Sequence, residues 1–144
     1  MGLKDEAWRQ ARAAYPFHAT LQTRYGDMDA NAHLNNVAIA RLFEEARLRF
    51  HMAARAEADA IDPSGVLLAH IAIDYLAEGR YPAEVEAGVG VEALGGRSYR
   101  LALALFQDWR AMALGQCVMV HREGMGPAMR GALEARMVER KVRA

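Results

Sequence analysis

Cysteine is almost absent from the sequence, with Cys117 the single example in 144 residues. One thiol cannot close an internal disulfide, so nothing in the chain requires an oxidising compartment. Cys117 lies in a strongly apolar run, and none of its sequence neighbours is of a kind that lowers a thiol pKa. The sequence therefore predicts a buried core thiol at this position rather than a nucleophile.

A net charge is also missing, because 18 Lys and Arg residues balance 18 Asp and Glu residues. General binding of nucleic acid needs a basic field that neutralises phosphates, so this balance argues against that class of protein. Hydrophobic residues make up 53% of the chain. A neutral chain with so many apolar residues is typical of a subunit that associates with copies of itself.

Long apolar runs are lacking as well. No stretch approaches the roughly 20 apolar residues of a membrane helix, so no membrane span is expected. The N-terminus carries Lys4, Asp5 and Glu6 and has no apolar core, unlike a signal peptide. We therefore expect a cytoplasmic protein. A length of 144 residues is close to the commonest size of a single domain.

What the sequence does contain is one long helical pattern and several strand patterns. Within residues 36–58, apolar side chains recur at three- and four-residue steps, namely Ile39, Leu42, Phe43, Ala46, Phe50 and Ala53. Alternating or continuous apolar residues predict strands over residues 17–25, 66–76, 83–94, 99–109 and 111–120. Turn-forming residues interrupt the pattern at Asp62-Pro63-Ser64-Gly65 and at Gly95-Gly96.

Both ends of the chain are rich in helix-favouring residues. We expect a helical extension over residues 1–16, ended by Pro16, and a C-terminal helix over residues 126–144. The complete order is strand, turn-rich loop, long helix and four strands with short hairpins. This order predicts a single α+β domain over residues 1–144, with an antiparallel sheet wrapped around the long helix.

The segment from Gly26 to Asn36 carries the chemistry. Its sequence GDMDANAHLNN places two carboxylates, an imidazole and side-chain amides between a strand and the start of the long helix. Unpaired N–H groups and a partial positive charge at a helix N-terminus stabilise negative charge that develops on a carbonyl oxygen. A carboxylate just upstream can attack that carbonyl or activate water. The alternative is a polar loop that only caps the helix, with Asn35 at the N-cap position.

Three sequence blocks carry a resemblance to a known family. They are Arg24-Tyr25-Gly26-Asp27-Met28-Asp29, His33-Leu34-Asn35-Asn36 and Leu42-Phe43-Glu44-Glu45-Ala46-Arg47. In their order and spacing they resemble the signature of the 4-hydroxybenzoyl-CoA thioesterase family. The resemblance implies a hotdog fold, in which a five-stranded antiparallel sheet wraps a long central helix. It also implies a homodimer or homotetramer whose active sites lie at the subunit interface.

The resemblance assigns roles to the polar loop. Asp29 matches the catalytic carboxylate, which acts as a nucleophile or as a general base on water. Asp27 matches a position that is more often read as loop structure. The N–H of Asn36 matches the group that polarises the thioester carbonyl. His33 matches a histidine of many members that orients the water or the carboxylate.

Further positions match outside the loop. Glu44 matches an acidic position on the helix with a catalytic role, and the alternative is an ion pair with Arg41 or Arg47. The residues expected to bind substrate are Tyr25, Asn35, Ile39, Arg97 and Ser98. Of these, Arg97 and Ser98 match the region that meets the phosphates or pantetheine of coenzyme A. The alternative for Arg97 is a solvated hairpin charge.

Two residues depart from the family pattern. Many relatives have Gly directly before the histidine, whereas this chain has Ala32, for which a left-handed backbone is costly. Ile39 stands where an aromatic residue is common, and this change alters the shape of the pocket. Both departures leave the proposed catalytic carboxylate in place. They affect which acyl group the pocket is expected to accept.

The resemblance therefore implies an acyl-CoA thioesterase that needs no cofactor, because coenzyme A is part of its substrate. Two alternatives stay open: a hotdog dehydratase or hydratase acting on 3-hydroxyacyl or enoyl thioesters, and a non-catalytic acyl-CoA-binding subunit. The presence of Asp29 argues against both. No metal site is expected, because the remaining histidines have no metal-ligand spacing and are predicted to be structural or exposed; they are His18, His51, His70 and His121.

Overall fold

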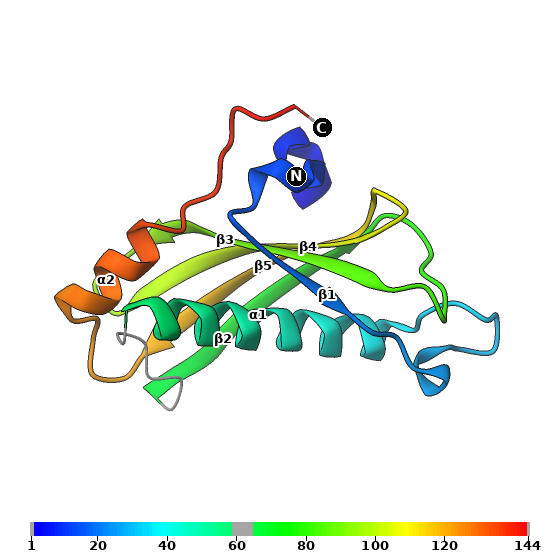
Figure 1. Cartoon of the computed structure of the whole chain (residues 1–144), viewed down its shortest axis with the longest axis horizontal. Coiled ribbons are helices and arrows are strands. Elements are labelled where there is room, and N and C mark those ends of the chain that lie inside the picture. The colour runs from blue at the N-terminus through cyan, green and yellow to red at the C-terminus, as the bar shows by residue number, and fades with distance from the viewer. Residues whose placement is uncertain (1, 59–64, 144) are drawn as a thin grey trace.

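The computed structural model describes residues 2–58 and 65–143, so Asp62, Pro63 and Ser64 of the predicted break lie outside the described residues. One antiparallel sheet has the strand order β1-β3-β4-β5-β2. Its strands are β1 (Phe17–Leu21), β2 (Val66–Tyr75), β3 (Val85–Leu94), β4 (Ser98–Gln107) and β5 (Arg110–His121). The long helix α1 (Asn36–Ala58) lies along one face of this sheet (Figure 1). The predicted α+β arrangement is confirmed.

The main hydrophobic core lies between α1 and the sheet. Leu42, Phe43 and Phe50 of the helix are fully buried. They pack with alternate strand residues, including Leu101, Leu103 and Leu105. Because successive side chains of a strand point to opposite faces, the residues between them face the other side of the sheet. Fully burying each large apolar side chain contributes about 1.5–3 kcal/mol, which fixes the register of the helix on the sheet.

The opposite face of the sheet is buried as well, beneath the two ends of the chain (Figure 1). Ala102, Ala104 and Phe106 of β4 form a second apolar cluster there, packed against side chains of the N-terminal segment. The pattern of β4 is therefore apolar on both faces, as in a strand that is covered on both sides.

The N-terminal extension differs from the expected continuous helix over residues 1–16. It forms three short 3₁₀ helices, Leu3–Asp5, Ala7–Gln10 and Arg12–Ala14. The side chains of Trp8, Ala11 and Ala14 are buried on the sheet. Their three-residue spacing aligns them on one face of a 3₁₀ helix, so packing against the sheet outweighs the α-helical preference of the sequence.

The C-terminal segment is also only partly helical. The helix α2 spans Pro127–Glu134, which is shorter than the expected 126–144. Beyond it the chain runs beside β3, where the N–H of Val91 donates to the carbonyl of Arg136 (2.8 Å) and the N–H of Val138 donates to the carbonyl of Val91 (3.0 Å). The pairing of β1 with β3 stops at Phe17, directly after Pro16, so this part of β3 has an unpaired edge. The C-terminal tail supplies hydrogen-bond partners for the backbone groups of this edge.

The buried thiol and imidazole side chains have structural roles in the core. Cys117 is fully buried, as predicted, and burial raises the pKa of its thiol to about 11. The ring of His51 is buried and its Nε2 lies 2.6 Å from the Tyr99 hydroxyl. Burial, with the nearby charge of Arg47, lowers the pKa of His51 to about 4, so this imidazole is neutral at physiological pH.

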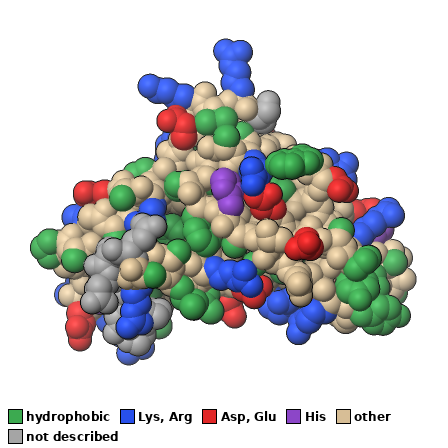
Figure 2. Space-filling model, viewed as in Figure 1, with side chains coloured by type: hydrophobic (Ala, Val, Ile, Leu, Met, Phe, Trp, Pro, Cys, Tyr) green, Lys and Arg blue, Asp and Glu red, His purple; other side chains and the backbone are tan. Residues whose placement is uncertain are grey.

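The molecular surface agrees with the zero net charge. On the face in Figure 2, basic and acidic side chains are interspersed. None of the helices in the described part of the chain is long and apolar enough to cross a membrane.

A buried ion pair joins the N-terminal segment to the sheet. The guanidinium of Arg9 donates to the carboxylate of Glu92, and both side chains are 3% exposed. Glu92 also accepts a hydrogen bond from Gln116 (2.9 Å), and the guanidinium of Arg9 also donates two hydrogen bonds to Glu6 (3.0 and 2.9 Å). With these additional bonds, both charges of the pair are satisfied inside the protein.

Glu92→Ala is expected to lower the free energy of unfolding by about 3–5 kcal/mol, because the Arg9 guanidinium then stays buried without its buried carboxylate partner. Urea unfolding followed by circular dichroism measures the loss. The matched control is Glu86→Ala, which removes an Arg12–Glu86 pair whose side chains are 41% and 26% exposed. This control should cost less than about 1 kcal/mol. Equal losses in the two variants would contradict the burial argument.

Candidate active site

The loop that leaves β1 is held by the carboxylate of Asp27. The predicted strand over residues 17–25 ends at Leu21, and Tyr25–Asp27 form a 3₁₀ turn. Asp27 is 3% exposed and accepts hydrogen bonds from the N–H of Arg24 (2.8 Å) and from the guanidinium groups of Arg24 (3.1 Å) and Arg41 (2.9 Å). Burial raises the pKa of this carboxyl, but these donors outweigh burial and the net pKa is lowered.

The start of α1 is capped by Asn35. Its side-chain Oδ1 accepts a hydrogen bond from the N–H of Ala38 (2.7 Å), and its own N–H donates to the carbonyl of Asp27 (2.9 Å). Capping was the alternative role for Asn35 in the sequence analysis, and it occupies this oxygen. The N–H groups of Asn36 and Val37 precede the first intrahelical bonds of α1, and both residues are exposed. They form the free positive end of the helix.

Asp29 is exposed, and one of its two carboxylate oxygens is fixed by the backbone. Oδ1 accepts hydrogen bonds from the N–H groups of Asn31 (2.8 Å) and His33 (3.2 Å). A backbone bond from the Asp29 N–H to the His33 carbonyl (2.8 Å) closes the same turn. Within the described part of the chain, Oδ2 has no hydrogen-bond partner. The turn therefore orients the carboxylate and leaves one oxygen free to react.

Asp29 and His33 border one cavity of about 350 Å³. Ile39 of α1 contributes to its wall, as do Tyr75 at the end of β2 and Met112 of β5. The cavity thus lies where the polar loop, the helix start and the segment after β2 meet. Such a mixed apolar and polar cavity, next to a helix N-terminus, fits a small ligand that carries a carbonyl group.

Glu78 is part of this cavity and was not predicted from the sequence. Its Oε2 lies 3.0 Å from Nε2 of His33. The two loops are also joined by the backbone, because the N–H of Leu34 donates to the carbonyl of Gly79 (2.8 Å). In the sequence, Glu78 looks like part of a turn, and no local spacing links it to His33.

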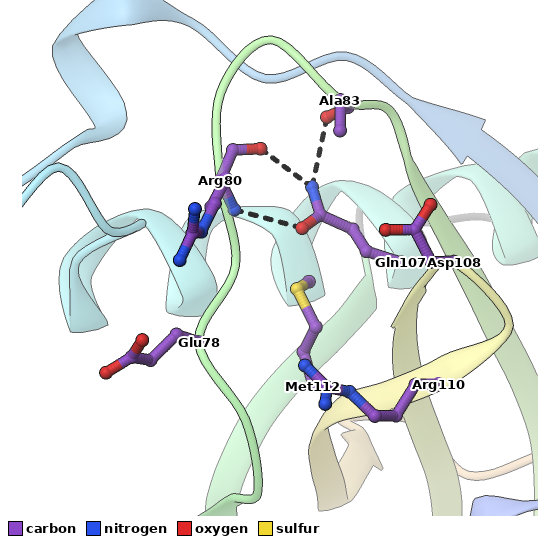
Figure 3. A pocket seen from close by; sticks show the side chains of 7 residues that line it. All are labelled: Glu78, Arg80, Ala83, Gln107, Asp108, Arg110 and Met112. Carbon is purple, nitrogen blue, oxygen red and sulfur yellow. Dashed lines mark hydrogen bonds between the residues drawn. The ribbon is translucent and has the colours of Figure 1, made fainter.

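A second cavity of about 530 Å³ adjoins the first and shares Glu78 and Met112 with it. Figure 3 shows the side-chain amide of Gln107, at the end of β4, bound to the loop between β2 and β3. Gln107 accepts from the N–H of Arg80 (2.9 Å) and donates to the carbonyls of Arg80 (2.9 Å) and Ala83 (3.1 Å). This amide fixes the shape of the loop that carries Glu78.

Several predicted site residues lie away from the cavity. Glu44 is exposed on α1, and Tyr25 is 75% exposed with its ring edge-on to Tyr81. Among the described residues, no metal-binding group of three or more His, Cys, Asp or Glu side chains occurs. The structure of one chain therefore unites Asp29, His33 and Ile39 and leaves Glu44 and Tyr25 outside.

Arg97 and Ser98 lie at the far end of the sheet. The guanidinium of Arg97 donates to the carbonyl of Arg122 (3.1 Å), and Ser98 pairs with Val120. The nearby β2 residue at this end is Val66, whereas Tyr75 at the other end of β2 borders the cavity. A strand of this length spans about 30 Å, so these two residues cannot reach the Asp29 cavity of their own chain.

A long helix packed on a five-stranded antiparallel sheet, with a polar loop at the helix start, defines the hotdog class of enzymes. The model of the Thioesterase-like superfamily matches residues 23–126, and the chain belongs to that superfamily. It is accordingly a thioester hydrolase. None of the proteins with curated descriptions matches the sequence.

Solved structures support the same assignment. The PA5185 protein of Pseudomonas aeruginosa PAO1 is similar at 27% identity and a TM-score of 0.78, over 90% of this chain and 97% of that one. A thioesterase from Thermus thermophilus, complexed with coenzyme A and Zn, has 25% identity and a TM-score of 0.74, over 85% and 94%. A 1,4-dihydroxy-2-naphthoyl-CoA thioesterase from Synechocystis shares the fold at 14% identity and a TM-score of 0.70, over 81% and 94%.

The polar loop contains one strained residue. Ala32 has a φ of 59°, in the left-handed region that favours glycine. The turn around Asp29 enforces this angle, because the N–H of Ala32 donates to the Asp29 carbonyl (3.1 Å) and the next residue binds the Asp29 carboxylate. The costly backbone at Ala32 is therefore part of the geometry that orients Asp29.

Ala32→Gly is expected to raise the free energy of unfolding by about 0.5–1 kcal/mol, since relief of the left-handed strain exceeds the added entropy of the unfolded chain. Urea unfolding provides the measurement. Ala30→Gly is the matched control, because Ala30 in the same loop has no positive φ, and it should be neutral or destabilising. A lower free energy of unfolding in Ala32→Gly would contradict backbone strain at Ala32.

Proposed function

We propose that the protein hydrolyses an acyl-CoA to a free carboxylic acid and coenzyme A. The observation that carries this proposal is the Asp29 carboxylate, which has one oxygen fixed by backbone N–H groups and one oxygen free at a cavity beside a helix N-terminus. This arrangement offers a reactive carboxylate and an electrophilic helix end to the same carbonyl group.

Two roles of Asp29 are consistent with this geometry. As a nucleophile, its free oxygen attacks the thioester carbon and expels the CoA thiolate, and water then hydrolyses the acyl–Asp29 anhydride. As a general base, it takes a proton from the water that attacks the thioester directly. In both routes negative charge develops on the carbonyl oxygen, and the N–H of Asn36 stabilises it.

Coenzyme A as the leaving group is supported by the relatives. One similar enzyme was solved with coenzyme A bound, and another is a thioesterase of an aromatic acyl-CoA. Ile39 in the cavity wall supplies an apolar surface for the acyl group. No cofactor enters the proposal, because coenzyme A is itself part of the substrate.

A homodimer joined through β2 completes the site. β2 pairs with β5 on one side only, so its other edge is open in the single chain. Leu67 and Leu68 are 43% exposed on it and Tyr75 is 57% exposed. A long apolar edge of this kind needs a covering partner. Antiparallel pairing of two copies of β2 forms a continuous sheet related by a two-fold axis.

This pairing also accounts for the distant coenzyme A residues. A two-fold axis near the middle of β2 places the Val66 end of one subunit beside the Tyr75 end of the other. Arg97 and Ser98 of the partner subunit then lie at the mouth of the cavity that contains Asp29. Arg97 can bind a phosphate there, and the active site is shared between subunits.

The purified protein is expected to release free thiol from at least one member of a panel of aliphatic and aromatic acyl-CoAs, followed with a thiol-reactive dye. Asp29→Asn should lower kcat by about 100- to 10,000-fold with little loss of stability, because the side chain is exposed. The control Glu134→Gln changes an exposed carboxyl far from the cavity. If no acyl-CoA in the panel releases free thiol, the hydrolysis proposal is refuted. The appearance of enoyl-thioester absorbance would instead indicate a dehydratase. Binding of an acyl-CoA without turnover would indicate a non-catalytic binding subunit. An unchanged rate in Asp29→Asn excludes Asp29 as the catalytic carboxylate.

The shared site is tested by mixing two variants. Arg97→Ala should raise KM about tenfold through a lost phosphate contact. When subunits of Asp29→Asn and Arg97→Ala are co-expressed, half of the dimers are mixed, and each mixed dimer has one intact site. Activity at low substrate concentration should therefore recover to about a quarter of the wild-type value. Activity no higher than the mean of the two parent variants would place both residues in the site of a single subunit.

A further inference from the structure

Glu78 occupies a place that the sequence motifs do not explain. Its carboxylate lies in the wall of the cavity that contains Asp29, and its Oε2 is 3.0 Å from Nε2 of His33. In the described part of the chain, this carboxylate has no partner other than His33. The side chain is 65% exposed and that of His33 is 26% exposed, so burial does not force the contact.

The backbone on both sides of Glu78 is fixed by hydrogen bonds. The N–H of Ala77 donates to the carbonyl of Met112 (3.1 Å), and the carbonyl of Gly79 accepts from Leu34 (2.8 Å). The N–H of Arg80 donates to Gln107 (Figure 3). Three successive anchors fix the backbone on both sides of this exposed residue, so its carboxylate is within reach of the imidazole before any substrate binds.

We propose that Glu78 is a positioning residue that orients His33 for the proposed thioester hydrolysis, on which this inference rests. A carboxylate has no hydrogen to donate, so its position 3.0 Å from Nε2 favours the neutral tautomer of His33 in which Nε2 carries the hydrogen. Nδ1 then carries the lone pair and acts as an acceptor at the cavity. Such carboxylate–imidazole pairs fix both the tautomer and the orientation of the ring.

This tautomer defines what His33 does. A water molecule that donates one hydrogen to Oδ2 of Asp29 and the other to Nδ1 of His33 directs a lone pair at the carbonyl carbon. As the new C–O bond forms, Asp29 takes the first proton and the carbonyl electrons move to the oxygen near the N–H of Asn36. When the C–S bond breaks, the sulfur keeps the electron pair and receives that proton, which gives the acid and the thiol.

The same orientation serves the nucleophilic route. There the water attacks the acyl carbon of the acyl–Asp29 anhydride, and the C–O bond to Asp29 breaks with its electron pair on the Asp29 carboxylate. The proton that the water loses passes to the CoA thiolate released in the first step, which gives the acid and the thiol. The Nδ1 acceptor of His33 again holds the second hydrogen of the water. Glu78 therefore has one role in both routes.

Glu78→Ala is expected to lower kcat for the best acyl-CoA by about 10- to 100-fold, with KM changed less than about threefold. Glu78→Gln, whose amide oxygen still accepts from Nε2–H, should restore most of kcat. In ¹⁵N spectra of the imidazoles, recorded in alkaline solution and assigned with His33→Ala, the wild type should show the Nε2–H tautomer at His33. Glu78→Ala should show a mixture of tautomers.

Two controls separate a positioning role from a general effect. Glu84→Ala removes an exposed carboxylate beyond the same loop and should leave kcat unchanged. In a His33→Ala background, Glu78→Ala should cause no further loss, because Glu78 acts through the imidazole. An additive loss, an unaltered kcat in Glu78→Ala or an unaltered tautomer overturns the inference. If the wild type releases no thiol from any acyl-CoA, the proposed hydrolysis fails instead, and the tautomer measurement still tests the Glu78–His33 contact.

Discussion

The carboxylate of Asp27 ties the chain that enters the site to the helix that leaves it. It binds Arg24, three residues after the end of β1, and Arg41 in the second turn of α1, while the Asp27 carbonyl accepts the N–H of Asn35. These bonds fix the distance between the loop and the free N–H groups at the start of α1. Because Asp29 lies only two residues further on, its placement beside the helix end depends on this buried anchor, and so does every proposed chemical role of the loop.

Two neighbouring carboxylates therefore have different tasks, and their environments decide which is which. Asp27 is almost fully buried and satisfied by two guanidinium groups, and its lowered pKa keeps it charged as an anchor. Asp29 is exposed and held only through Oδ1 by backbone N–H groups. A carboxylate that already neutralises two cations is a poor nucleophile, whereas one with a free oxygen at a cavity can react. The strained backbone of Ala32 belongs to the turn that keeps this oxygen free.

Sequence periodicity was sufficient to predict the helices and strands in which apolar residues recur regularly within the segment itself. The three- and four-residue steps over residues 36–58 predicted α1, and alternation predicted the strand that became β3. The conformation of the two chain ends was not predictable from periodicity, because it depends on packing against the sheet. Trp8 and Ala11 pack on the sheet as one face of a 3₁₀ segment, and the tail after α2 pairs with Val91. In the site, Asp29 and His33 were predicted from the loop motif, and Ile39 from the resemblance to the family. Glu78 lies 45 residues beyond His33 and meets it only through tertiary structure, so no spacing rule could find it.

The two edges of the sheet differ in how open they are to pairing with another strand. β1 has five residues, and the guanidinium of Arg49 covers the Thr20 carbonyl on it (3.3 Å), so this edge is short and charged. β2 has ten residues, with exposed Leu67 and Leu68. The outer face of the sheet is closed by the termini through the Arg9–Glu92 pair. Charged, short edges oppose pairing and long apolar edges favour it. The proposed self-association through β2 therefore uses the edge whose end borders the Asp29 cavity, and in that proposal it supplies the second wall that the cavity of one chain lacks.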